Sequence, residues 1–158
     1  MNFDMHGFAE ILAQRLPVRS DSPEGTEGTE AAAAAIARQL PPGTVIALHG
    51  TLGAGKTVFA RGFARALGIV EPVSSPTFTL VQEYPFPGGV LYHLDLYRID
   101  NSTNALAFGV DEYLYDPRAY TLVEWPERIM DILPPHTLHL LLRPLHGQNQ
   151  RELSLAGV

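Results

Sequence analysis

The sequence predicts an α/β fold in which helices cover both faces of a mixed, mostly parallel sheet, and three observations predict it. A short apolar run, TVIAL, leads directly into a glycine-rich stretch that is followed by a helical pattern. Further apolar runs rich in β-branched residues recur towards the C-terminus. The length of 158 residues suffices for a sizeable core. Strands that alternate with helices are typical of such sheets, so we expect one domain over residues 1–158.

The first well-defined element is predicted to be an alanine-rich helix. Residues 1–14 would precede it as an extra N-terminal segment, with an added helix as one interpretation. The stretch SDSPEGTEGTEAAAAA begins as a loop and continues as the helix, with Thr26 or Thr29 as N-cap and Glu30 in the first turn. The helix should end near Leu40, because the Pro-Pro-Gly run that follows cannot continue it.

A buried strand and a second helix are predicted next, on either side of the glycine-rich stretch. The apolar run 45–48 predicts a strand that is buried on both faces. The pattern KTVFARGFARALG then predicts a helix with Phe59, Phe63 and Leu67 on one face, ending at Gly68.

Five later runs predict the remaining strands. TFTLVQEY and GVLYHLDLY should form two strands joined around Pro85 to Gly89, and YTLVE should form another. TLHLLL and RELSLA should form the last two, joined by a turn at HGQNQ. Some of these strands are expected to be antiparallel additions to the parallel part of the sheet.

Composition and charge exclude several classes of protein. The chain has no cysteine, so disulfides and thiolate metal sites are excluded. We recognise no signal peptide and no apolar run long enough to span a membrane, so a cytoplasmic location is expected. The net charge of −6 disfavours a protein whose main affinity is for a phosphate backbone. Any RNA contact is therefore expected to belong mainly to a partner.

The stretch GTLGAGKT, residues 50–57, satisfies the pattern G-x-x-x-x-G-K-[ST], with a predicted strand before it and a helix after it. Its glycines let the backbone turn tightly and point N–H groups at phosphate oxygens. Lys56, the only lysine of the chain, would reach the β- and γ-phosphates, and the Thr57 hydroxyl would bind Mg²⁺. The sequence thus predicts a P-loop NTPase-like three-layer sandwich.

Two acidic residues stand where apolar strands are predicted to end. They are Asp95 and Glu124, and ligands of open α/β sheets collect beyond such strand ends. One carboxylate could hold Mg²⁺ while the other orients the attacking water. His93 would point the same way as Asp95, either as part of a metal site or, as we favour, as a hydrogen-bonded structural histidine. The remaining histidines of the C-terminal part are interpreted as structural or surface residues: His136, His139 and His146.

The stretch SSPTFT lies between the second helix and the next predicted strand. Many P-loop NTPases sense the γ-phosphate in this region, and Ser74, Ser75 and Thr77 offer hydroxyls. From the residues alone, an ordinary Ser/Pro loop is the favoured interpretation.

The nucleotide is expected to be ATP. Guanine-specific P-loop proteins usually read the base with an N/T-K-x-D motif, which needs a second lysine that this chain lacks. Three classes remain: an ATPase that drives a partner, a small-molecule kinase, and a regulatory module with negligible turnover. Kinases clamp the transferred phosphoryl group with clustered arginines, whereas Arg98, Arg118 and Arg128 are widely spaced here.

Four stretches together resemble the TsaE (YjeE) family: LHGTLGAGKTVFARGFARALG, VSSPTFTLVQEY, LYHLDLYR and LVEWPER. Their order and spacing match from about residue 29 to about residue 142. The resemblance implies an ATPase of bacterial tRNA threonylcarbamoyladenosine (t6A) synthesis. Such a protein would bind a transferase of the TsaD type and its TsaB-type scaffold, and would meet tRNA indirectly through them.

The resemblance also implies roles for individual residues. Asp95 and Glu124 would serve Mg²⁺ binding and hydrolysis, and Thr29 would lie near the adenine. Ser75 and Thr77 would form a switch-like segment beside the γ-phosphate, which reverses the interpretation from the residues alone. The nucleotide loop would comprise Gly50, Leu52, Gly53, Ala54, Gly55, Lys56, Thr57 and Val58. One departure is Thr51, where the family usually has aspartate. Arg61, Arg65 and Arg98 are candidates for a cation supplied within the chain.

Overall fold

The computed structural model describes residues 14–19, 27–50, 55–74, 76, 79–144 and 150–156. Several predictions fall on other residues and lie outside this part: the segment before residue 14, the turn at 145–149, and five of the predicted nucleotide-binding residues. These five are Leu52, Gly53, Ala54, Ser75 and Thr77. In the ranges just given, no helix is both long and apolar enough to cross a membrane.

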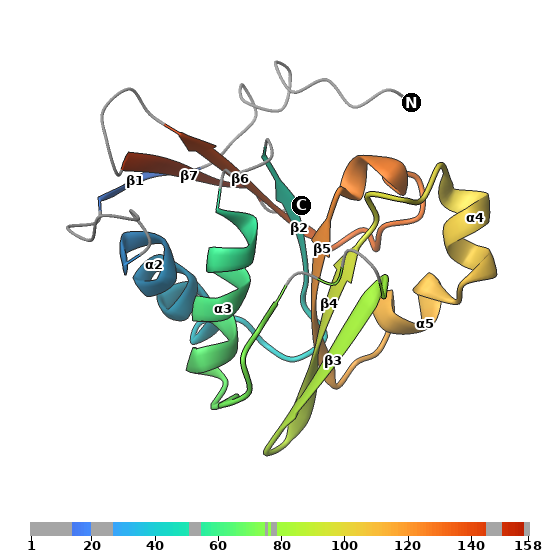
Figure 1. The fold of residues 1–158 in the computed structure, drawn as a ribbon, viewed down its shortest axis with the longest axis horizontal. Coiled ribbons are helices and arrows are strands. Elements are labelled where there is room, and N and C mark those ends of the chain that lie inside the picture. The colour runs from blue at the N-terminus through green and yellow to red at the C-terminus, as the bar shows by residue number, and fades with distance from the viewer. Residues whose placement is uncertain are drawn as a thin grey trace.

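One sheet of seven strands runs through the described structure, in the order β1-β7-β6-β2-β5-β4-β3 (Figure 1). The strands β6, β2, β5 and β4 form the parallel centre, whereas β7 and β3 pair antiparallel with their neighbours. The strands are β1 (Gln14–Arg19), β2 (Val45–His49), β3 (Val81–Phe86), β4 (Gly89–Asp95), β5 (Ala119–Glu124), β6 (Leu138–Pro144) and β7 (Gln150–Ala156). The prediction of a mixed, mostly parallel sheet is confirmed.

Helices lie on both faces of the sheet, which gives the predicted three layers (Figure 1). On one side lie α2 (Glu27–Ala37) and α3 (Lys56–Ala66), and on the other α4 (Ser102–Ala107) and α5 (Val110–Leu114). The alternation of side chains along β2 shows the division, because Ile46 and Leu48 join the core under α2 and α3, whereas Val45 joins the core under α4 and α5. Phe59 and Phe63 of α3 are fully buried in the first core, as their spacing predicts.

The pair α2 and α3 packs closely at Gly62. A Cβ atom added there would lie 2.5 Å from the carbonyl oxygen of Glu30, so only glycine permits this approach. The Glu30 carboxylate also accepts a hydrogen bond of 2.6 Å from Arg65. Thr29 is the third residue of α2 and 1% exposed, so its prediction as N-cap is wrong. The alternative cap, Thr26, lies outside the described residues.

The hairpin β3–β4 differs from the prediction at both ends of β3. The strand begins at Val81, because Leu80 turns with a φ of +69° and its N–H bonds the Pro76 carbonyl. It then continues through Pro85, so the turn begins only at Pro87. Pro85 is tolerated because β3 is an edge strand of the sheet, where a missing N–H costs little.

Strand β1 is an element that the sequence pattern does not predict. It pairs antiparallel with β7 at the other edge of the sheet, from Gln14 opposite Leu155 to Arg19 opposite Gln150. Its sequence, QRLPVR, contains a proline and two arginines, a composition that predicts a strand poorly.

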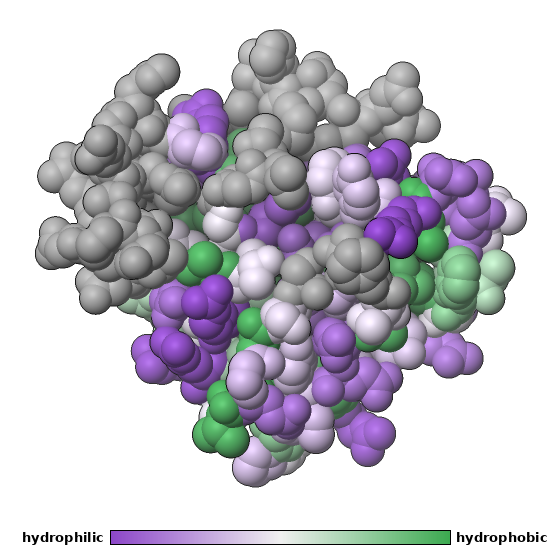
Figure 2. All heavy atoms as spheres, viewed as in Figure 1, coloured by the Kyte–Doolittle hydropathy of each residue, from purple (hydrophilic) through white to green (hydrophobic). Residues whose placement is uncertain are grey.

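Figure 2 shows one face of the molecule, on which hydrophobic residues are scattered in small groups between hydrophilic ones.

Candidate functional site

The carboxyl ends of the parallel strands β2, β4 and β5 meet at one edge of the sheet, and the two predicted acids stand there. Asp95 ends β4 and Glu124 ends β5, and the two residues are register partners. Glu124 is also the partner of Leu48 in β2, whose side chain packs on the α3 side. Register partners in a parallel sheet point to the same face, so both carboxylates face the side of α3. Each acid is only 5% exposed.

The glycine-rich stretch connects this edge to the start of α3. Gly50 follows β2 with a φ of +149°, and Gly55 precedes α3 with a φ of +106°. Positive φ values of this kind are strained for residues with a Cβ, which explains both glycines. The helix begins at Lys56, and the Gly55 carbonyl accepts from Phe59 N–H at 2.9 Å. The free N–H groups of the first turn therefore point out of the helix at the site.

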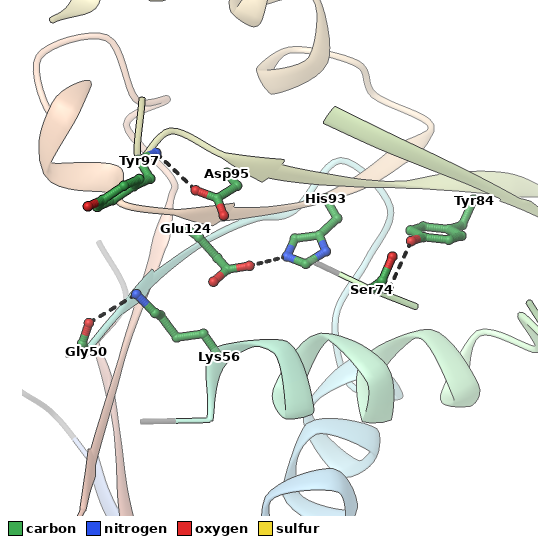
Figure 3. Close-up of polar contacts among 8 residues, drawn as sticks. All are labelled: Gly50, Lys56, Ser74, Tyr84, His93, Asp95, Tyr97 and Glu124. Carbon is green, nitrogen blue, oxygen red and sulfur yellow. Dashed lines mark hydrogen bonds and ion pairs between the residues drawn. The ribbon is translucent and has the colours of Figure 1, made fainter. Parts of the chain in front are cut away.

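Lys56 is 6% exposed and extends towards the strand ends rather than into solvent (Figure 3). Its Nζ donates to the Gly50 carbonyl at 3.1 Å and lies 4.5 Å from the ring centroid of Trp125. Trp125 directly follows Glu124, with a φ of +59°, and its ring packs 5.1 Å from that of Tyr97. Lys56, Gly50 and the strand ends are thus brought together.

Each carboxylate at the strand ends has a defined contact (Figure 3). Oδ1 of Asp95 accepts from the Tyr97 N–H at 3.0 Å. Oε2 of Glu124 lies 2.6 Å from Nε2 of His93, which is fully buried. The interpretation of His93 as a hydrogen-bonded histidine is confirmed, but the sequence did not reveal that its partner is Glu124.

The oxygen donors at this edge fit Mg²⁺ better than a softer metal. In the described part of the chain, no group of three or more His, Cys, Asp or Glu side chains could hold a metal by itself. Mg²⁺ is usually bound by one or two carboxylates together with water and substrate phosphates, so it needs no such cage. Asp95, Glu124 and the half-buried Thr57 of the first turn of α3 supply suitable oxygens.

Four other predicted residues lie on the helices α2 and α3. Thr29 is buried within α2, which packs along α3. Arg61 and Arg65 both point at Glu30 of α2, at 3.8 and 2.6 Å, so these two candidate cations are engaged in helix packing. Val58 is half-buried in the first turn of α3.

A pair of histidines beside the loop was not predicted as part of the site. Nε2 of His49, the last residue of β2, lies 2.9 Å from Nδ1 of His139 on β6. Burial, the neighbouring His139 and the charge of Lys56 lower the pKa of His49 from 6.5 to about 3. The only sequence signal was a polar residue that ends an apolar strand just before the first glycine.

The His49 pair predicts acid sensitivity of folding. The folded chain keeps His49 neutral, whereas the unfolded chain takes up a proton at this residue below pH 6.5. The free energy of unfolding is therefore unaffected by this group above that pH and falls as the pH drops towards 3. The expected loss is about 1 kcal/mol per pH unit for one such group. Urea unfolding at pH 6.5 and 5.5 should show a smaller loss for His49→Gln than for the wild type. The exposed control His136→Gln should behave like the wild type, and equal losses in His49→Gln and wild type would contradict the prediction.

Three comparisons relate the chain to known proteins. Residues 24–153 match the family model of the threonylcarbamoyl adenosine biosynthesis protein TsaE. The tRNA threonylcarbamoyladenosine biosynthesis protein TsaE of Bacillus subtilis is 39% identical over 145 residues, which cover 92% of this chain and 87% of the relative. The protein of the same name from Treponema pallidum is 40% identical over 121 residues, covering 77% and 87%. The crystal structure of Bacillus subtilis YdiB matches with a TM-score of 0.72 and 36% identity, over 92% of this chain and 86% of that one.

Proposed function

Because this chain belongs to the TsaE family of tRNA threonylcarbamoyladenosine biosynthesis, we propose that it binds ATP with Mg²⁺ and hydrolyses it to support t6A modification by a partner transferase complex. One observation carries the proposal: the buried Lys56 at the start of α3 lies beside Gly50 and extends towards the strand ends that hold Asp95 and Glu124. A lysine, a glycine loop and acids at parallel strand ends are the parts from which P-loop NTPases build a phosphoryl-transfer site.

The predicted site residues have distinct roles in the proposed reaction. The ammonium group of Lys56 would leave the Gly50 carbonyl and bind the β- and γ-phosphates, and the N–H groups at the start of α3 would add donors. Bound Mg²⁺ would neutralise the phosphate charge, held by Thr57 and by one of the two carboxylates. The other carboxylate would orient the attacking water. The predicted residues outside the described part would complete the phosphate contacts: Leu52, Gly53, Ala54, Ser75 and Thr77.

The arginines support an ATPase over a small-molecule kinase. Arg118 precedes β5, at the opposite end of this strand from Glu124, whereas Arg128 follows Glu124 and stands beside Trp125. Because Arg118 stands at that opposite end, Arg98, Arg118 and Arg128 do not form one phosphoryl-clamping cluster, and Arg61 and Arg65 bind Glu30 instead. Hydrolysis by the isolated chain should be slow, because a P-loop site to which no partner supplies an arginine finger is a poor catalyst.

The proposed partners are proteins of the t6A pathway, which the names of the relatives state. We propose a TsaD-type transferase and its TsaB-type scaffold in the cytoplasm, with tRNA held by them. The net charge of −6 supports this division, because an acidic protein is a poor primary site for a phosphate backbone.

A reconstituted modification reaction tests the proposal and its main alternative. Preformed threonylcarbamoyl-adenylate is supplied, so that added ATP serves only this chain. With ATP, each transferase should modify many tRNA molecules; with a non-hydrolysable ATP analogue, modification should stop after about one round. If the analogue supports repeated modification as well as ATP does, the chain is a nucleotide-sensing regulatory module and not an ATPase.

A further inference from the structure

We infer that His93 is a positioning residue whose Nε2–H holds the Glu124 carboxylate in one orientation, an inference that rests on the proposed ATP hydrolysis. His93 lies on β4 and Glu124 on β5, and their side chains meet at 2.6 Å. In Figure 3 one carboxylate oxygen turns to His93, and the side chain of Lys56 lies on the other side of Glu124.

Strand register explains how the two side chains meet. Asp95 is the register partner of Glu124, and His93 lies two residues before Asp95 on the same face of β4. The imidazole therefore reaches Glu124 diagonally, from the sheet interior. From there it contacts the inner oxygen, Oε2. Among the residues drawn in Figure 3, the second oxygen, Oε1, has no marked contact, so it could bind water or a metal at the strand ends.

The burial of His93 shows that this contact is the main polar role of its ring. The side chain is 0% exposed, and within the described ranges its Nδ1 has no hydrogen-bond partner. Its register neighbour on β5 is the fully buried Leu122. Burying an imidazole in such surroundings costs free energy that an apolar side chain of similar size would not cost. The strand itself therefore does not require a histidine here, whereas orientation of Glu124 does.

The direction of the hydrogen bond follows from the chemistry of the pair. A carboxylate oxygen can only accept a hydrogen bond. Nε2 of His93 therefore carries the hydrogen and donates the hydrogen bond to Oε2. Nδ1 has no hydrogen-bond partner among the described residues, so the contact with Oε2 is the one that orients the ring. A donor of this kind stops rotation of the carboxylate and fixes the direction of Oε1. Removing such a supporting partner typically lowers activity by about 10–100-fold.

Two substitutions separate positioning from simple support of the fold. His93→Leu removes the donor, whereas His93→Gln keeps an N–H group near the place of Nε2. We expect His93→Leu to lower the ATP turnover rate about 10–100-fold while its affinity for a non-hydrolysable ATP analogue stays unchanged. His93→Gln should recover most of the lost turnover. The exposed His136→Gln serves as control, and thermal melting confirms that each variant folds.

The structural alternative gives different results. Wild-type turnover in a folded His93→Leu would overturn the inference. So would an equal loss of turnover and nucleotide affinity, because His93 would then support the loop rather than the carboxylate.

Side-chain NMR provides a readout that does not depend on hydrolysis. The ¹⁵N–¹H spectrum of the wild type should show a proton on Nε2 of His93, identified by its loss in His93→Gln. This resonance should shift in Glu124→Gln, where a neutral oxygen replaces the charged one. An unshifted resonance would overturn the pairing of His93 with Glu124. This test does not need His93→Leu, so it holds even when that variant does not fold. Absence of ATP turnover in the wild type would instead count against the proposed function, and the NMR result would still judge the pairing.

Discussion

Replacing Lys56 with alanine is expected to weaken ATP binding by two orders of magnitude or more, which is the largest effect on nucleotide affinity expected of any single substitution. The ammonium group is the only lysine charge in the chain, and it already lies at the loop carbonyl of Gly50. A hydrogen bond to a charged group contributes about 1.5–3 kcal/mol, and Lys56 would contact two phosphates. Loss of both contacts therefore removes a large part of the binding free energy.

Calorimetric titration with a non-hydrolysable ATP analogue and Mg²⁺ measures this effect. Arg65→Ala is the matched control. It removes a cation from the same helix, but this cation binds Glu30 and not the site. Its ATP affinity should equal that of the wild type. Lys56→Arg should remain impaired, because the planar guanidinium does not replace a compact ammonium in a tight phosphate loop. If a folded Lys56→Ala bound the ATP analogue with unchanged affinity, the glycine-rich stretch would not be the ATP site.

Replacing Glu124 or Asp95 with alanine should lower ATP turnover far more than ATP binding. Both carboxylates stand at the strand ends with most of their surface buried, and each has a partner that fixes it. They would act on Mg²⁺ and on the attacking water, and a positioned general base typically contributes about 10²–10⁴-fold in rate. Nucleotide affinity would persist because Lys56 and the loop remain.

Turnover and nucleotide affinity are therefore measured side by side for each variant. Glu127→Gln is the control, because this exposed acid stands three residues after Glu124 and faces solvent. Glu124→Gln keeps the shape of the side chain and should be as inactive as Glu124→Ala if the charge is what matters. Wild-type turnover in both Asp95→Ala and Glu124→Ala would rule out the two-acid site.

Local patterns predicted the centre of the fold well. The buried strand β2, the glycines and helix α3 follow each other directly in sequence, so apolar runs and turn residues define them without knowledge of distant contacts. The ends of elements were less accurate. Thr29, one of the two expected caps of the first helix, lies inside it, because a capping residue type also fits a buried helical position. Pro85 was expected in a turn, because the sequence does not show that β3 is an edge strand.

The candidate site was predicted as a set of residues but not as a set of contacts. Asp95 and Glu124 could be placed at strand ends, and the register confirms that they are neighbours. The contact of His93 with Glu124 spans 31 residues, and that of His49 with His139 spans 90. Such pairs depend on which strands are adjacent and in what register, which no local pattern specifies.

The central claim is that this chain hydrolyses ATP on behalf of partner proteins, and phosphate release from ATP tests it most directly. The assay uses the purified chain alone, then with a TsaD-type transferase and its TsaB-type scaffold, and repeats both with Glu124→Gln. We expect slow release by the chain alone, strong stimulation by the partners, and no stimulation with Glu124→Gln. If the partners do not stimulate release although the chain binds ATP tightly, the claim of a partner-driven ATPase is wrong.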